Sequence, residues 1–400
     1  MKFLSALLVS AALIFCGCNR EQILSIIRED LFSLDIGGME DQIDLFNLEG
    51  GRSAQKTSLA MRDGLFYISN GNGEKIVRYT SYGDLLFMIY NEETNPPPLS
   101  LRPLGGDGVV TRWALTYPLN SPGVIAVDSR KHIYVEDRFP YERHGFDTEN
   151  KALLDSMILH FDDDGRFVEY LGQEGTGGTP FPRISGVFTS IQDELAVICR
   201  LPQGWQIYWF DSNGVPLYKI PLPDRAVPIP SDRADVFPSV DAITAAPDAR
   251  LLFIKVDYYR DTYDESTNIR SGNKGDSSII WIMNVENGSY AGTIDVPFFE
   301  YTFTANNRQV TESLLYSMLG VIKNNRVFLS FPVEGGYSIL ILSADSKEQR
   351  RGFIKVDDEE LMFNTFYLSE DGMLLGLLAT NWNAKLVSWR TDHLAGDITL

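Results

Sequence analysis

Cysteine and histidine are both scarce in this sequence. Only three of the 400 residues are cysteine, namely Cys16, Cys18 and Cys199. With a single cysteine in the body of the chain, a framework of disulfides is excluded and Cys199 is expected to be a buried thiol. The four histidines follow neither an HxH nor an HExxH spacing, which argues against a histidine-based zinc site. We therefore predict no metal and no cofactor.

Basic residues are also in short supply. The chain has 35 Lys and Arg against 54 Asp and Glu, a net charge of −19. Binding to nucleic acid requires clustered Lys and Arg against the phosphates, and attraction to anionic lipid requires the same sign of charge. The composition thus excludes a general nucleic-acid binder and a peripheral protein held by anionic lipid, and it favours an acidic, solvated surface.

Long apolar runs are missing except at the amino terminus. Lys2 is followed by the almost unbroken apolar run Phe3–Phe15, which has 13 residues. A membrane-spanning helix needs roughly 18 or more apolar residues, whereas the apolar region of a signal peptide is shorter. The run therefore predicts a cleaved export signal, and no transmembrane helix is expected in the rest of the chain.

The signal ends at a candidate lipidation site. Cys18 follows the small residue Gly17, whereas Cys16 follows the bulky Phe15. The segment resembles the lipobox of bacterial lipoproteins, and Phe15 three positions before Cys18 is similar to the looser lipoboxes of spirochaetes. The resemblance implies a signal peptide over residues 1–17 and a diacylglyceryl group plus an acyl chain such as palmitate on Cys18. An ordinary secretory signal with an incidental cysteine is the alternative.

The segment 18–35 is expected to tether the body of the chain to the lipid. The apolar residues within Glu21–Phe32 recur every three or four positions, which favours a short amphipathic helix. Its simplest role is that of a spacer, and packing against the body or the membrane is the alternative.

One stretch shows the repeating unit of the remainder. Ser156–Gly172 contains two β-type runs around the dipeptide Asp164-Gly165, a combination typical of a β-hairpin. Looser copies divide residues 36–400 into six units of about four strands, at 57–90, 123–171, 186–220, 240–296, 317–356 and 363–389. This succession predicts an all-β, six-bladed β-propeller, with five or seven blades or an array of two-sheet sandwiches as alternatives. The last unit lacks one strand, which Ile43–Leu48 is expected to supply.

The clearest copy of the unit carries a family resemblance. Val124–Asp128, His132–Asp137 and Ile158–Asp162 with the following Asp164-Gly165 resemble blades of six-bladed propellers of the NHL and YVTN-like kind. Together with the lipobox, the chain resembles the lipid-anchored propeller proteins of spirochaetes. The resemblance implies binding of proteins, peptides or other ligands, because only a minority of such propellers are enzymes.

Insertions between the expected strands are the candidate binding segments, because propellers place recognition on loops. They are Asn91–Pro118, Arg138–Asn150 and Tyr258–Gly275, with the linker Phe298–Asn307 as a fourth. Tyrosine, tryptophan and arginine are favoured at binding hot spots. The predicted partner-binding residues are Trp113, Tyr141, Arg143, Tyr258, Tyr259, Arg260 and Tyr263.

The sequence gives little support to catalysis. Asp162–Gly165 has the composition of a calcium loop but lacks the acidic residue of an EF-hand at its twelfth position, so a hairpin turn is favoured. Some six-bladed propellers are metal-dependent lactonases with carboxylates in the central channel. The carboxylates that could serve in this way, together with one amide, are Glu136, Asp137, Asp257 and Asn381.

We expect a lipid-anchored module of the bacterial cell envelope that faces the periplasm and binds an envelope protein or peptide as a partner or scaffold. No catalytic residue is assigned. A lactonase-like hydrolase and an adhesin exposed at the cell surface are the two alternative functions.

Overall fold

The computed structural model describes residues 24–46, 55–104, 111–233, 235–264, 266–305, 308–344, 348–391 and 394. The predicted signal peptide and Cys18 lie outside these residues. The described part of the chain consists of β-strands and three 3-10 turns, η1 (Tyr141–Arg143), η2 (Asp224–Ala226) and η3 (Asp358–Glu360). It contains no helix with the length and apolar character of a membrane span.

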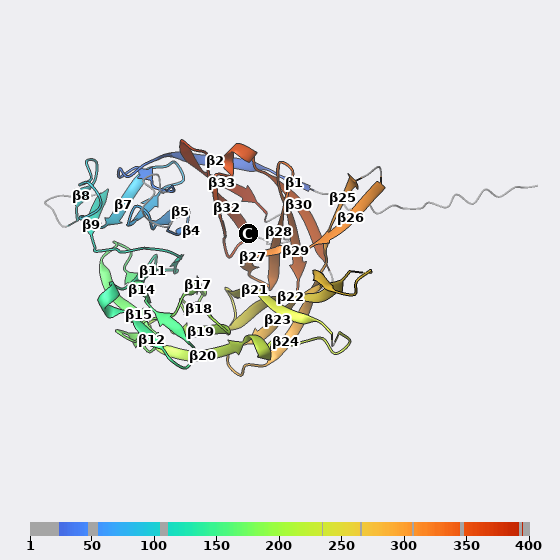
Figure 1. Cartoon of the computed structure of the whole chain (residues 1–400). Helices are drawn as coiled ribbons and strands as arrows, with labels where there is room; N and C mark the ends of the chain where they lie inside the picture. Colours follow the sequence, from blue (N-terminus) through green and yellow to red (C-terminus); the bar gives the residue numbers. More distant parts are fainter. Residues whose placement is uncertain are drawn as a thin grey trace, which may run out of the picture.

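Six sheets of four to six strands are arranged around a common centre (Figure 1). Blade 1 contains β4 (Thr57–Arg62), β5 (Leu65–Asn70), β6 (Lys75–Tyr79), β7 (Leu85–Tyr90), β9 (Trp113–Thr116) and β8 (Arg102–Pro103). Blade 2 contains β10 (Ile125–Val127), β11 (Ile133–Arg138), β14 (Ser156–Phe161), β15 (Phe167–Gly172) and β16 (Gly175–Thr176). Blade 3 contains β17 (Ile184–Thr189), β18 (Leu195–Leu201), β19 (Gly204–Phe210) and β20 (Pro216–Pro223).

The second half of the chain forms the other three blades. Blade 4 contains β21 (Phe237–Ala245), β22 (Leu251–Tyr263), β23 (Arg270–Asn284) and β24 (Tyr290–Val296). Blade 5 contains β27 (Ser317–Ile322), β28 (Arg326–Val333), β29 (Gly336–Ser343), β30 (Gln349–Lys355) and β1 (Leu24–Ile26). Blade 6 contains β31 (Phe363–Leu368), β32 (Met373–Ala379), β33 (Asn383–Arg390), β2 (Arg28–Ile36) and β3 (Gln42–Ile43). Two separate hairpins are β12 (Gly145–Asp147) with β13 (Ala152–Leu154), and β25 (Phe299–Ala305) with β26 (Arg308–Leu314).

The innermost strands close a ring. β4, β10, β17, β21, β27 and β31 each contact the next one around the centre, and β31 returns to β4. The predicted all-β propeller fold is therefore confirmed, with six blades in the described chain. The turns explain much of the agreement between the predicted and the observed strands. Asp63 and Gly64 adopt φ values of 51° and 71°, and Asn324 and Asn325 adopt φ values of 62° and 54°. These positive angles suit the tight hairpins that such residues predict.

The hydrophobic core lies between successive blades. Trp389 of blade 6 is fully buried in a cluster shared with blade 5, and Trp209 of blade 3 is buried in a cluster shared with blade 4. Because each blade buries both of its faces against neighbours, its strands are apolar at nearly every position, as in β19, where all seven residues are buried.

The amino-terminal segment closes the ring, but with a different strand from the predicted one. β2 pairs antiparallel with β33 from Arg28 opposite Trp389 to Asp35 opposite Asn383. The predicted closing strand Ile43–Leu48 is wrong, since β3 covers only Gln42–Ile43 and pairs parallel with β2. The predicted helix over Glu21–Phe32 is also wrong, because its described part forms β1 and most of β2.

A β-bulge explains why this strand resembled a helix. The pairing of β2 with β33 shifts between Asp30 and Phe32, so that Leu31 is an extra residue without a partner. A bulge reverses the alternation of side chains by one position. The β2 residues before the bulge are polar, so the helix-like spacing of four positions runs from Ile27, between β1 and β2, to the extra residue Leu31.

The same segment joins three blades. β1 pairs parallel with β30 of blade 5, and β2 completes blade 6. Beyond the bulge, the ring of Phe32 lies 5.2 Å from that of Tyr79 and 6.2 Å from that of Phe66, both in blade 1. The amino-terminal strands therefore hold blade 1 against blades 5 and 6.

An ion-pair cluster fixes the start of β2. The guanidinium of Arg28 donates two hydrogen bonds to the carboxylate of Glu360, at 2.5 and 2.9 Å, and Lys385 donates a third at 3.0 Å. The hydrogen bond from Arg28 is the main reason why the pKa of Glu360 falls to about 2. This cluster therefore ties the start of β2 to η3 and β33.

We expect Glu360→Gln to lower the free energy of unfolding by about 2 kcal/mol at pH 7, because two buried or half-buried cations lose their charge partner. In the unchanged protein this stabilisation is complete above the ordinary pKa of a glutamate, near 4.5, and is lost as the pH falls toward 2. Denaturant unfolding at pH 7 and pH 3 measures both effects. Equal stability of the variant and the parent at pH 7 would contradict the role given to the cluster.

Candidate binding face

The two faces of the ring differ in construction. One face carries the turns that join the first strand of each blade to the second, and we name it the turn face. These turns are short, and each touches the turn of the next blade by a hydrogen bond or an ion pair. The contacts are Lys131–Asp63, Ser129–Asp193, Ile191–Pro247, Asn324–Asp248, Lys323–Glu370 and Arg62–Glu370. The turn face is thus a closed structural ring.

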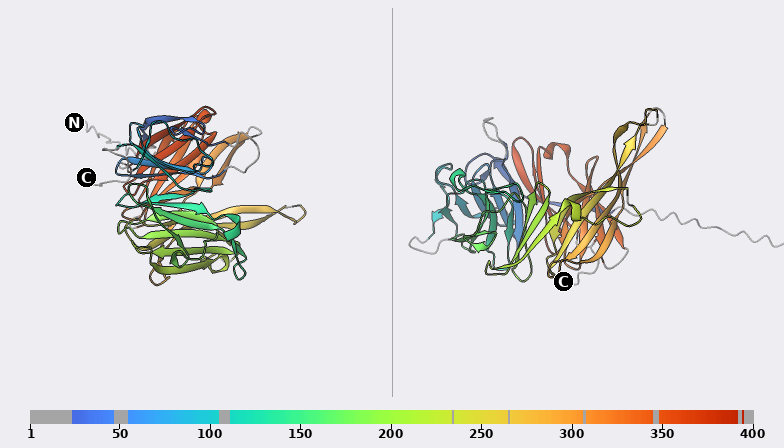
Figure 2. Two further views of the ribbon diagram at one scale, coloured as in Figure 1. Left: turned by 90° about the vertical axis from the view of Figure 1, so that its left-hand side faces the viewer. Right: turned by 60° about the horizontal axis from the view of Figure 1, so that its bottom comes forward.

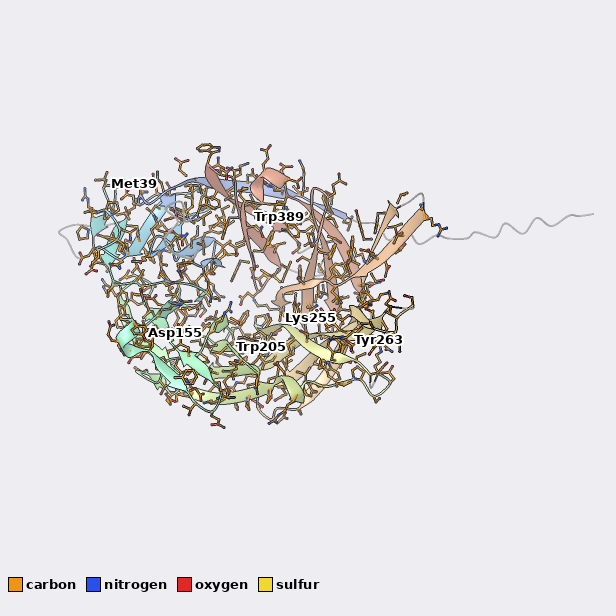
Figure 3. The ribbon with its side chains drawn as sticks, viewed as in Figure 1. Met39, Asp155, Trp205, Lys255, Tyr263 and Trp389 are labelled. Carbon is orange, nitrogen blue, oxygen red and sulfur yellow. The ribbon has the colours of Figure 1, made fainter. Side chains whose placement is uncertain are left out.

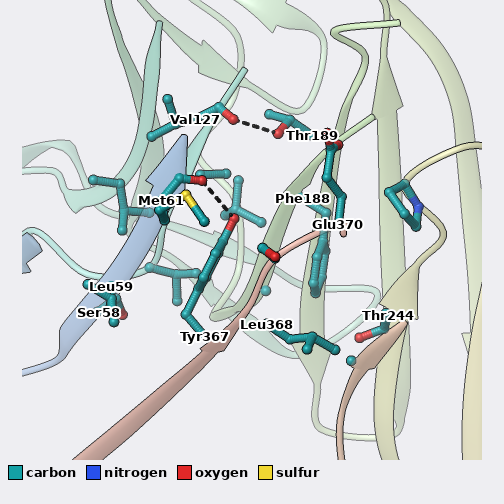
Figure 4. Close-up of a pocket in the computed structure, with 18 of the residues that line it drawn as sticks. Ser58, Leu59, Met61, Val127, Phe188, Thr189, Thr244, Tyr367, Leu368 and Glu370 are labelled. Atoms are coloured by element: carbon teal, nitrogen blue, oxygen red, sulfur yellow. Dashed lines mark hydrogen bonds between the residues drawn. The ribbon is translucent and has the colours of Figure 1, made fainter. Parts of the chain in front are cut away.

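The central channel opens near the turn face (Figure 4). It encloses about 300 Å³ and is lined by all six innermost strands. Two of its polar side chains are engaged: Thr189 donates to the carbonyl of Val127 at 3.0 Å, and the Tyr367 hydroxyl donates to that of Met61 at 3.3 Å. The rest of the lining mixes aliphatic residues with polar ones such as Ser58, Ser185 and Thr365.

The opposite face carries the insertions, and we name it the insertion face. In an up-and-down blade, the turn between the second and third strands and the connection to the next blade emerge on the same side. The described additions to the basic blade follow these connections: residues 37–46 and 55–56 before β4, 91–104 and 111–124 before β10, 139–155 between β11 and β14, the ends of β22 and β23, and the hairpin β25–β26. Every long addition in the described chain therefore belongs to one face.

Two β-ribbons project on the side of blades 4 and 5 (Figure 2). The first is formed by the ends of β22 and β23, which remain paired from Tyr258 opposite Ser277 to Tyr263 opposite Arg270. The predicted loop Tyr258–Gly275 is therefore wrong in its conformation. The second ribbon is β25–β26, in place of the predicted linker Phe298–Asn307.

A groove lies at the other side of the insertion face, over blades 1 and 2. It has a volume of about 950 Å³, within the range of ligand sites in proteins. Its walls are the segment after β2, the β5–β6 turn, the end of the connection to β10, and η1 with its flanks. The lining residues are Ile36, Gly37, Gly38, Asp44, Phe46, Gln55, Gly71, Asn72, Glu74, Asn120, Ser121, Arg138, Phe139, Pro140, Tyr141 and His144.

Hydrogen bonds hold the floor of the groove in place. The Ser121 hydroxyl donates to Oε1 of Gln55 at 2.7 Å, and the backbone N–H of Gln55 donates to Oδ1 of Asn72 at 2.8 Å. Buried Asp137 accepts from the backbone amides of Asn120 and Ser121, and its burial raises its pKa to about 6. The Nδ2 of Asn72 has no hydrogen-bond partner, so a ligand acceptor could satisfy it.

Aromatic and basic side chains form the rim. Tyr141 is 84 % exposed and its ring meets that of His144 edge-on at 5.4 Å. The Nε2–H of His144 donates to the carbonyl of Phe139 at 2.8 Å, which fixes the short η1 turn. Arg143 lies 4.1 Å above the Phe139 ring and donates to the Tyr170 hydroxyl at 3.1 Å. Tyr141 is thus the free anchor of this rim, and Arg143 is held by its neighbours.

The remaining predicted partner-binding residues divide into packed and exposed ones. Trp113 lies in β9, where it stacks on Phe87 at 5.8 Å and donates to the Asp164 carbonyl at 2.8 Å. Tyr258 is fully buried, with its hydroxyl donating to the carbonyl of Pro228 at 2.5 Å. Packing alone accounts for both residues. Within the predicted insertion Asn91–Pro118, the residues around Trp113 form an additional strand of blade 1, paired with β7.

The outer part of the first ribbon is more accessible. Tyr259 stacks on Phe237, and Arg260 forms ion pairs with Asp276 at 2.8 Å and Asp235 at 2.6 Å. Tyr263, 55 % exposed, stands far out on the ribbon, away from Lys255 nearer the ring (Figure 3). Of the four predicted residues on this ribbon, Tyr263 is the one that the structure leaves most open to a partner.

Of the three carboxylates considered for lactonase chemistry, Asp137 accepts hydrogen bonds from backbone amides and the other two are held in ion pairs. Glu136 accepts two hydrogen bonds of 2.7 Å from Lys56, and Asp257 accepts bonds of 2.7 and 2.9 Å from Lys255. Neither carboxylate lines the 300 Å³ channel. Asn381 lies in the exposed β32–β33 turn. Among the described residues, no group of three or more His, Cys, Asp or Glu is placed to hold a metal ion.

A search of known protein families finds no match for this sequence, and a search of curated proteins finds none either. Solved structures do match over most of the chain. The β-propeller domain of the Trilobed protease from Pyrococcus furiosus shares 11% identity and a TM-score of 0.40, covering 84% of this chain and 94% of that one. The gluconolactonase XC5397 from Xanthomonas campestris has the same identity and TM-score, covering 84% and 85%. Kuenenia stuttgartiensis hydrazine synthase shares 11% identity and a TM-score of 0.39, covering 82% and 79%.

These neighbours are distant, so the fold assignment depends on the strand pairing of the chain itself. The closed succession of six innermost strands is the observation that defines the propeller.

Proposed function

We propose that the protein is a lipid-anchored binding module of the bacterial cell envelope, which holds a protein or peptide partner in the groove of its insertion face. The observation that carries the proposal is the asymmetry of the two faces. The turn face is closed by contacts between its own turns, whereas the long additions gather on the other face around a 950 Å³ groove. The groove is also lined by the exposed Tyr141 and by Arg138, and tyrosine and arginine are enriched at binding hot spots.

Co-purification tests the binding role. The parent protein, the groove variant Arg138→Ala with Tyr141→Ala, and the turn-face variant Ile191→Ala with Arg130→Ala would be tagged and isolated from solubilised envelopes. We expect one protein to accompany the parent and the turn-face variant and to fall by about tenfold or more with the groove variant, as the loss of a hot spot requires. A partner retained equally by all three would contradict binding in the groove.

The proposed anchor is supported by Cys18 and the apolar run before it. Two or three acyl chains hold a protein stably on a membrane, whereas a chain without lipid partitions into water. We expect the purified protein to begin at Cys18 with the added mass of its acyl groups and to enter the detergent phase, and Cys18→Ser to lose both properties. An unmodified amino terminus would contradict the anchor and leave the groove proposal untouched.

A further inference from the structure

The hairpin β25–β26 is a two-stranded sheet with free edges. Its strands pair along their whole length, from Phe299 opposite Leu314 to Ala305 opposite Arg308. In the part of the chain that the structure describes, no other strand is hydrogen-bonded to either of them. Each strand therefore presents unpaired N–H and C=O groups along one side, the feature to which an additional strand can pair.

The two faces of this ribbon are chemically different. One face carries hydroxyl groups, with the side chains of Thr302 and Thr311 hydrogen-bonded at 2.9 Å and Ser313 donating to Glu300 at 2.9 Å. The other face carries alternate residues of β25, namely Phe299, Tyr301 and Phe303, opposite Leu314, Glu312 and Val310. This alternation is typical of a strand whose apolar face is covered.

Only the base of the apolar face is covered by the protein itself. Phe299 stacks on Phe331 of blade 5 at 4.5 Å and meets Tyr316 edge-on. Farther out, Tyr301 is 50 % exposed and stacks on Phe303 at 5.6 Å. An isolated hairpin that buries so little is marginally stable in water, which favours the presence of an additional element against it.

We propose that an extended strand of a partner protein pairs with the free edge of β25 and packs its alternate side chains beside Tyr301 and Phe303. The two-residue repeat of the aromatic side chains and of the unpaired backbone groups matches a strand, and it matches neither a helix nor a small ligand. The edge of β26 is less suitable, because Arg308 and Glu312 lie on its apolar face and charges of this kind guard an edge. The partner strand is therefore expected to alternate apolar and polar residues.

The proposal goes beyond the groove and does not depend on it. The bases of the two ribbons are close together. A Cβ atom added to Gly275 of β23 would lie 3.5 Å from the ring of Phe298, which directly precedes β25. Both ribbons project on the same side of the ring (Figure 2), away from the groove over blades 1 and 2. The two sites can thus be impaired separately.

Selection from a phage-displayed library of random peptides tests the proposal, with peptides of about twelve residues, longer than a typical strand. We expect the full chain to enrich peptides with apolar residues at every second position. Tyr301→Lys with Phe303→Lys should weaken them by about tenfold or more. The control variant Thr302→Lys with Thr304→Lys adds the same charge to the hydroxyl face of the same strand. This control and the groove variant should bind the peptides as the parent does. Bound peptide should slow hydrogen exchange of backbone amides in β25.

Several results would overturn the proposal. The library could yield no enriched peptide, or peptides whose apolar residues follow a helical period. The two lysine variants could bind peptide equally well while keeping the thermal stability of the parent. Bound peptide could also slow the hydrogen exchange of backbone amides in β26 alone. Concentration-dependent dimerisation that Tyr301→Lys with Phe303→Lys abolishes would assign the edge to a second copy of this chain instead of a partner protein.

Discussion

A chain that starts at residue 37 should fail to form a stable propeller, while a chain that starts at residue 23 should fold as the parent does. The shorter chain lacks β1 and β2, so β33 becomes an open edge and blade 6 keeps only three of its own strands. The apolar contacts of Phe32 with blade 1 and the burial of Leu34, which is 5 % exposed, are lost as well. Burial of two such side chains stabilises by about 4 kcal/mol in total.

The lost strand pairing and the Arg28–Glu360 contact add to this loss, so we expect a destabilisation of about 5 kcal/mol or more, the size of the whole free energy of unfolding of many domains. Thermal unfolding followed by circular dichroism measures the effect on both chains. A synthetic peptide of residues 24–36 added to the short chain should restore part of the stability. Melting temperatures that differ by only a degree or two would show that the amino-terminal strands do not close the ring.

Lys255→Met should cost about 3–5 kcal/mol, the effect expected when one partner of a buried ion pair is removed. Lys255 is fully buried, and its ammonium lies 2.7 Å from a carboxylate oxygen of Asp257 and 3.1 Å from one of Asp241. Asp257 also accepts a hydrogen bond of 2.6 Å from Ser278. Methionine keeps the length of the side chain, so the change in charge is separated from a change in volume.

The double variant Lys255→Met with Asp257→Leu is the matched control. When both members of a buried pair are replaced by apolar residues of similar size, the change is often nearly neutral. We therefore expect the double variant to recover most of the stability lost by the single one, in denaturant unfolding at pH 7. If the double variant is as unstable as the single variant, the pair does not act as the electrostatic unit described.

The blades were predictable from the sequence because their signals are local. The first unit was predicted over residues 57–90, and its strands β4 to β7 run from Thr57 to Tyr90, since short apolar runs bounded by Gly, Asn or Asp residues indicate strands. Closure of the ring was predicted in principle, because the last unit lacked a strand. The wrong segment was chosen since the bulge at Leu31 conceals the alternation of β2.

The ribbons and the groove were harder to predict. Beyond Tyr259 the β22–β23 ribbon has no covered face, so its residues do not alternate between apolar and polar, and its strands resembled a solvated loop. The groove depends on residues such as Gln55, Asn72 and Asn120, which are ordinary turn residues in the sequence. They come together only because closure brings the segment after β2 beside the turns of blades 1 and 2. The aromatic insertion around Tyr141 was the one part of the groove with a signal of its own.

Site-specific photo-crosslinking in intact cells tests whether the insertion face is the face that binds a partner. A photoreactive amino acid would replace Tyr141 in the groove rim in one strain and the exposed Ile191 of the turn face in another. We expect a discrete crosslinked protein from position 141 and none from position 191. The same crosslinked protein from both positions, or a crosslink from position 191 alone, would contradict binding at the insertion face.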